Sequence, residues 1–158
     1  MTSERDFKKL VRARMVDTGE TYTAARAALL AESEEAERFR AKTLRSFFRD
    51  GRLVAIPARR RARVVVLLEL LALFEAGRDY PEREVNDVLS AVHDDVAYLR
   101  RELVDYGFLN REASVYRVAE EWPTPGHTVA GELPPDAARR FARATREASG
   151  EGSHEALT

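Results

Sequence analysis

Hydrophobic residues at helical spacing predict two helices at the start of the chain. The first is indicated over residues 4–16, and Gly19 follows at a plausible C-terminal stop. Its apolar positions are Phe7, Leu10, Val11 and Met15. The second helix runs through residues 24–37, ending in an acidic stretch. We therefore expect a helical hairpin over residues 1–40.

The pattern changes in the middle of the chain. Helix continues or restarts through residues 36–48 and ends at the turn signal Asp50-Gly51. Residues 53–56 predict a short strand or an extended arm, closed by Pro57. Residues 62–75 are apolar on nearly every side, which is typical of a helix buried centrally or buried in a partner.

Two more helices and a hairpin follow. Tyr80-Pro81 predicts the opening of the second helix of this part, because proline is tolerated in a first helical turn. Asp94 is the expected N-cap of a third helix, which ends before Gly107. Residues 108–112 and 115–119 then predict two short strands. This order of elements is that of a winged helix-turn-helix.

The expected fold is therefore mainly α with a small β-hairpin. A winged helix-turn-helix-like domain covers residues 41–122, preceded by the helical hairpin of residues 1–40. Residues 123–158 predict a Pro/Gly linker, a short basic helix over residues 135–148 with Phe141 as its large apolar residue, and a disordered tail.

Composition excludes several classes of protein. The chain has 158 residues and no cysteine, which excludes disulfide scaffolds, thiolate metal sites and cysteine nucleophiles. The longest apolar run, Val64–Leu68, is far shorter than a membrane span. We expect a cytoplasmic protein with no membrane association.

The net charge of −1 conceals a segregation of charge along the chain. Residues 38–63 hold ten cations against one acid, Asp50, a local sum of +9. Residues 82–105 hold seven acids and three arginines, a local sum of −4. The near-zero total is thus a cancellation between blocks.

Several spaced motifs resemble one bacterial family, the domain-of-unknown-function family 2087. They are Phe47-Phe48-Arg49-Asp50-Gly51-Arg52-Leu53, Ile56-Pro57, Glu84-Val85-Asn86, His93-Asp94-Asp95, Leu99-Arg100-Arg101, Tyr106-Gly107 and Leu109-Asn110-Arg111. The resemblance covers residues 44 to about 122. It implies a small, mostly helical, winged-helix-like domain, in some members joined to a helix-turn-helix of the metalloregulator type, and hence transcriptional work by association.

No catalytic or metal-binding machinery is visible. The histidines, His93, His127 and His154, have no second ligand at a useful spacing, so we expect no metal and no cofactor. His93 beside Asp94 and Asp95 has two readings, a base oriented by a carboxylate or a turn residue, and the turn residue is favoured. We expect a protein that is not an enzyme.

Arginine side chains are the candidate site, because a guanidinium matches phosphate oxygens. The nucleic-acid-binding candidates are Arg45, Arg49, Arg52, Arg59, Arg60, Arg61, Arg63, Arg100, Arg101, Arg111 and Arg117. The exposed face expected for the third helix is less favourable, since Arg101 is its one cation and Asp105 lies in position to pair with it. For the basic block, phosphate binding and pairing with the chain's own acids stay equally open.

The sequence therefore predicts a nucleic-acid-binding protein of the transcription-regulator type, with DNA favoured over RNA. The alternative is a protein-interaction adaptor that uses the acidic surfaces of its second and third helices. In that alternative the apolar helix of residues 62–75 forms a homodimer.

Overall fold

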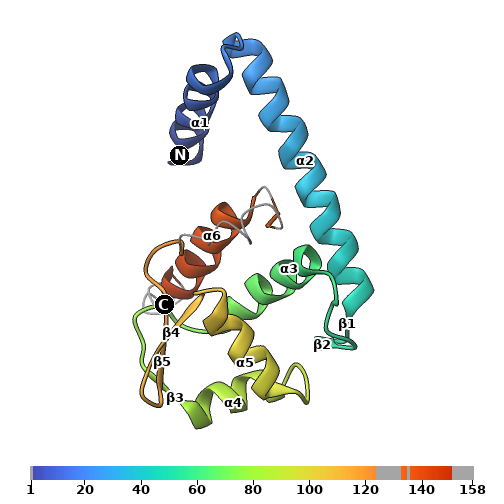
Figure 1. The fold of residues 1–158 in the computed structure, drawn as a ribbon, viewed down its shortest axis with the longest axis vertical. Coiled ribbons are helices and arrows are strands. Elements are labelled where there is room, and N and C mark those ends of the chain that lie inside the picture. The colour runs from blue at the N-terminus through green and yellow to red at the C-terminus, as the bar shows by residue number, and fades with distance from the viewer. Residues whose placement is uncertain (1, 124–132, 135, 151–158) are drawn as a thin grey trace, which may run out of the picture. The chain divides into compact units, whose positions relative to one another are not determined.

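The structure, a computed structural model, describes residues 2–123, 133–134 and 136–150 (Figure 1). They divide into two units, residues 1–39 and residues 40–158. The boundary lies inside a helix, α2 (Tyr22–Phe47). The helix therefore continues without interruption past residue 40, where the helical hairpin was predicted to end. The prediction of a mainly α fold with a small β-hairpin is confirmed.

Unit 1 consists of α1 (Thr2–Thr18) and the first part of α2. Gly19 has a φ of 73°, and its N–H donates to the Met15 carbonyl at 2.9 Å, which ends α1 as predicted. Arg14 joins the helices by ion pairs of 2.7 Å to Glu20 and 2.7 Å to Glu32. The bond from Arg14 lowers the pKa of the Glu20 carboxyl.

Unit 2 has the element order of a winged helix-turn-helix. Its sheet is antiparallel with the order β3-β5-β4, and β4 and β5 form the wing. The elements are α3 (Arg60–Leu71), β3 (Tyr80–Pro81), α4 (Glu82–Ser90), α5 (Val96–Asp105), β4 (Leu109–Glu112) and β5 (Val115–Val118). Short turns separate α4 from α5, and the wing follows α5 directly (Figure 1).

The prediction for Tyr80-Pro81 is wrong, because these residues form a strand and α4 begins at Glu82. Pro81 has an extended backbone, and Tyr80 pairs with Tyr116 across the sheet. Tyr80 is buried, its ring meets Phe74 edge-on at 5.3 Å, and its hydroxyl accepts the Glu75 N–H at 2.7 Å. The contacts of the buried Tyr80 side chain therefore hold β3 in place.

The N-cap of α5 also differs by one residue from the prediction. Asp95, and not Asp94, accepts the Tyr98 N–H at 3.1 Å. Asp94 lies one residue earlier, where its side chain is free to contact another element.

Helix α3 lies at the centre of the core. Its apolar side chains are almost completely buried within the chain: Val64, Val66, Leu67, Leu70 and Leu71. The one acid of this stretch, Glu69, forms an ion pair with Arg40. These side chains of α3 are therefore covered by its own chain.

A second hairpin, β1 (Phe48–Arg49) and β2 (Arg52–Leu53), follows α2. Asp50 and Gly51 have φ values of 51° and 77°, the pair of positive angles typical of a tight Asp-Gly hairpin turn. The Leu53 N–H donates to the Val92 carbonyl at 2.9 Å. The hairpin is thereby attached to the turn between α4 and α5.

The last helix among the described residues, α6 (Ala137–Gly150), belongs to the core of unit 2 and is not a separate appendage. It packs on α3, and its Phe141 ring lies 5.9 Å from Phe108 and 5.6 Å from Trp122. The predicted tail after residue 150 and most of the predicted linker lie outside the described residues. Within the described part of the chain, no helix has the length and apolar character needed to cross a membrane.

Candidate nucleic-acid interface

The eleven predicted arginines fall into groups that differ in their partners. Five form ion pairs with acids of the same chain: Arg52, Arg63, Arg100, Arg111 and Arg117. Arg60 and Arg61 also have interactions within the chain. The structure gives no partner among the described residues to Arg45, Arg49, Arg59 and Arg101.

Arg63 serves the fold. Its Nε lies 3.0 Å from a carboxylate oxygen of Glu102, and both side chains are largely buried, at 14% and 17% exposure. The same guanidinium donates weakly to the Pro57 and Ala58 carbonyls at 3.4 Å. Arg63 thus joins α3 to α5 and to the segment before α3.

Arg52 attaches the β1–β2 hairpin to the helix-turn-helix. It donates to the Ser90 and Ala91 carbonyls at the C-terminal end of α4, both at 3.3 Å, and pairs with Asp94 at 3.2 Å. Cations are stabilising at this end of a helix. Because the Asp94 side chain is 99% exposed, the pair itself is weak, and the carbonyl contacts set the position of Arg52.

Glu82, at the start of α4, holds α5 and the wing together. Its carboxylate pairs with Arg100 at 3.2 Å and with Arg111 at 3.9 Å, and it accepts the Tyr116 hydroxyl at 3.4 Å. Arg100 also donates to the Asn86 side chain. Arg111 lies over the Tyr116 ring, 5.6 Å from its centre, and donates to the Ala113 carbonyl at 2.8 Å.

A pocket of about 230 Å³ lies between α5 and the wing. Arg100, Arg101 and Arg111 line it, together with Asp105 and Tyr116. Arg101 is exposed, and the ion pair predicted between Arg101 and Asp105 is not formed. Three arginines that the sequence separates by up to eleven positions therefore converge on one pocket.

On the wing, Arg117 is directed elsewhere. Both its Nε and its Nη2 contact one oxygen of Asp79, at 2.8 and 2.7 Å. This contact ties β5 to the segment before β3 and takes Arg117 away from the pocket.

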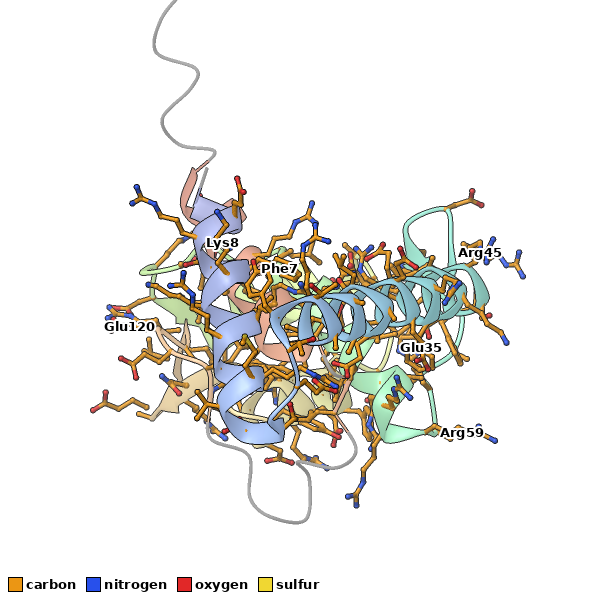
Figure 2. The ribbon with its side chains drawn as sticks, turned by 90° about the horizontal axis from the view of Figure 1, so that it is seen from above. Phe7, Lys8, Glu35, Arg45, Arg59 and Glu120 are labelled. Atoms are coloured by element: carbon orange, nitrogen blue, oxygen red, sulfur yellow. The ribbon has the colours of Figure 1, made fainter. Side chains whose placement is uncertain are left out.

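Four exposed cations without partners among the described residues lie on α2, on β1 and just before α3. Lys42 and Arg45 lie three residues apart on α2, and Arg49 follows on β1. Arg59 is the N-cap residue of α3, and its side chain makes no capping hydrogen bond. Figure 2 shows Arg45 and Arg59 extending away from the ribbon. We call Lys42, Arg45, Arg49 and Arg59 the free basic set.

Lys42 was absent from the candidates drawn from the sequence. Its three-residue spacing to Arg45 is the signal that would have included it.

His93 forms a hydrogen bond within the turn before α5. The His93 ring accepts the Asp95 N–H through Nδ1 at 2.9 Å, a contact within the turn before α5. Asp95 in turn caps α5, so neither group is directed at a reacting centre. In the described residues, no group of three or more metal-ligating side chains converges.

Arg140, on α6, was not singled out by the sequence either. It pairs with Asp136 at 2.9 Å, and the exposures of the two side chains are only 17% and 8%. Burial, and then the neighbouring Arg143, lower the pKa of the Arg140 guanidinium. The pair is local, because Asp136 directly precedes the first residue of α6.

Comparison with protein families matches residues 52–118 to the family described as "Uncharacterized protein conserved in bacteria (DUF2087)". The matched segment runs from β2 to the end of β5 and so contains α3, α4, α5 and the wing. The resemblance seen in the sequence is thereby confirmed. No curated protein and no solved structure matches the chain.

Proposed function

Residues 52–118 match a bacterial family whose members are uncharacterised, so we propose a function from the chain's own surface. The chain binds the phosphate backbone of nucleic acid, DNA in preference to RNA, as a transcription regulator. The free basic set and Arg101 make the contacts. No chemical step is assigned to the chain.

The observation that carries the proposal is the sorting of the arginines by partner. Those that hold unit 2 together are paired with acids, whereas Arg45, Arg49 and Arg59 are exposed, and no carboxylate of the described residues is near enough to pair with them. An exposed, unpaired guanidinium gives up little on meeting a phosphate, because it has no internal bond to break. These side chains are therefore the ones available to a polyanion.

The helix-turn-helix order supports a duplex as the partner. In such domains the helix after the turn enters the major groove. Here that helix is α5, and the β1–β2 hairpin with Arg49 is bonded to the turn that precedes it. The unpaired Arg101 lies on α5 itself.

Exposed acids make α5 poorly suited to contact the bases of a DNA duplex. Asp94 and Asp105 are exposed near the two ends of this helix. Carboxylates beside phosphates oppose close approach, so the phosphate contacts of the free basic set and Arg101 carry the affinity.

A salt series tests the proposal. A random DNA duplex, followed by fluorescence polarisation, should lose affinity steeply as salt rises. The triple variant Arg45→Gln, Arg49→Gln, Arg59→Gln should weaken binding and reduce the slope of log K against log salt by about 2–3, since each lost phosphate contact contributes about 0.9.

The control removes the same charge elsewhere: Arg26→Gln, Arg83→Gln and Arg146→Gln, all exposed. This control should bind as the unmodified chain does. Negligible binding at low salt, or equal losses in the two triple variants, would overturn the proposal and leave the adaptor alternative, whose sensitive residues are Asp94, Asp95 and Asp105.

A further inference from the structure

Unit 1 has a surface that neither the family match nor the proposed function explains. We propose that its two helices pair with the same two helices of a second copy of this chain, forming a four-helix bundle. The proposal concerns residues 1–39 and is independent of nucleic-acid binding.

The first argument is the small core of the unit. Its buried residues, among those described, are Val11, Ala25 and Ala36, two of which are alanines. A folding unit of about 40 residues usually needs a disulfide, a metal or association with another chain to be stable. The chain has no cysteine, and no metal-ligand cluster occurs among the described residues.

The second argument is apolar surface left open on both helices. Leu10 is 50% exposed and Val16 85% exposed on α1, while Tyr22 and Leu30 on α2 are 38% and 39% exposed. Amphipathic helices of this kind gain most of their stability by burying such side chains against another element.

The third argument is charge, and it selects a second copy as the occupant. On α1, Arg5, Lys9 and Arg12 follow one another at intervals of four and three residues, which places them along one side of the helix. On α2, Glu34 and Glu35 carry the opposite charge. All five are exposed, and none has an ion pair among the described residues.

Figure 2 shows Glu35 well away from α1 of its own chain. A two-fold arrangement brings α1 of each copy against α2 of the other. Every basic side then meets an acidic one, as a self-complementary interface requires.

Light scattering on the full chain, without nucleic acid, tests the pairing. We expect twice the chain mass of 17.9 kDa. The double variant Leu10→Gln, Leu30→Gln should shift the mass to that of one chain. Its control, Val54→Gln with Leu73→Gln, changes side chains of comparable exposure, 56% and 50%, in unit 2 and should remain a dimer.

Charge reversal makes the test specific for pairing between copies. One variant carries Arg5→Glu, Lys9→Glu and Arg12→Glu, and the other carries Glu34→Lys and Glu35→Lys. Each alone should be monomeric, because its α1 and α2 then have the same sign of charge. Mixed in equal amounts, they should form a heterodimer, since both α1–α2 contacts regain opposite charges.

Rescue on mixing also separates a lost interface from a misfolded chain, which would not recover. A monomeric unmodified chain at high concentration, or charge variants that do not recover on mixing, would overturn the pairing. Neither result bears on the salt series, whose test variant changes Arg45, Arg49 and Arg59 of unit 2.

Discussion

At the scale of single residues, the role of an arginine is decided by acids far along the chain. Arg52 meets Asp94, Arg63 meets Glu102, and Arg117 meets Asp79. None of these pairs has a helical spacing, so the sequence could show the charges but not their partners. The one local pair that spacing predicted, Arg101 with Asp105, does not form.

Gly107 provides a test at this scale. Its φ is 77°, and a Cβ at this position would lie 2.8 Å from the Pro123 Cβ. Gly107→Ala therefore combines backbone strain of about 1 kcal/mol with a steric clash. We expect it to lower the free energy of unfolding by about 2–4 kcal/mol, measured by urea denaturation.

The matched variant is Gly77→Ala. Gly77 has a φ of 81°, but a Cβ there would meet no atom within 4 Å. This variant should lose only the strain, about 1 kcal/mol. Equal losses at the two positions would show that the Pro123 contact is unimportant.

At the scale of elements, patterns of hydrophobic residues were sufficient for the helices and for the wing. They failed for β3, because a two-residue strand has no periodicity and its pairing partner, β5, lies much later in the chain. They also failed to place α6, since one phenylalanine in a basic helix gives no sign of an aromatic cluster. Phe108, Trp122 and Phe141 come together only in the folded chain.

Phe141→Ala tests the attachment of α6. Phe141 is 2% exposed, and removal of a buried phenylalanine typically costs about 3–5 kcal/mol. We expect a loss of that size in the free energy of unfolding. Arg146→Ala, on the exposed side of α6, should stay within about 0.5 kcal/mol of the unmodified chain. A small effect of Phe141→Ala would place α6 outside the core.

At the scale of the whole molecule, the arginines of the basic block are of two kinds. The sequence left open whether its charges face a partner or the chain's own acids, and the structure has paired and unpaired arginines within a few residues of each other. Arg63 is paired and largely buried, while Arg59 is exposed and has no partner among the described residues. A net charge close to zero is therefore compatible with a locally basic surface.

Single substitutions should distinguish arginines that stabilise the fold from arginines that bind nucleic acid. Arg63→Gln leaves Glu102 buried without its cation and should lower the free energy of unfolding by about 3 kcal/mol. Arg45→Gln should leave stability unchanged within about 0.5 kcal/mol and weaken binding to a DNA duplex. Denaturation and polarisation measured on both variants check this; a stability loss at Arg45 equal to that at Arg63 would contradict it.

The packing of α6 on α3 has a consequence for how the protein is made. The segment between α3 and α6 contains α4, α5 and the wing. The core therefore joins two helices that are far apart in the sequence. During synthesis, α3 emerges long before Phe141 does. Its apolar side chains stay without their final cover until α6 has left the ribosome, so unit 2 completes its folding only after α6 has been synthesised.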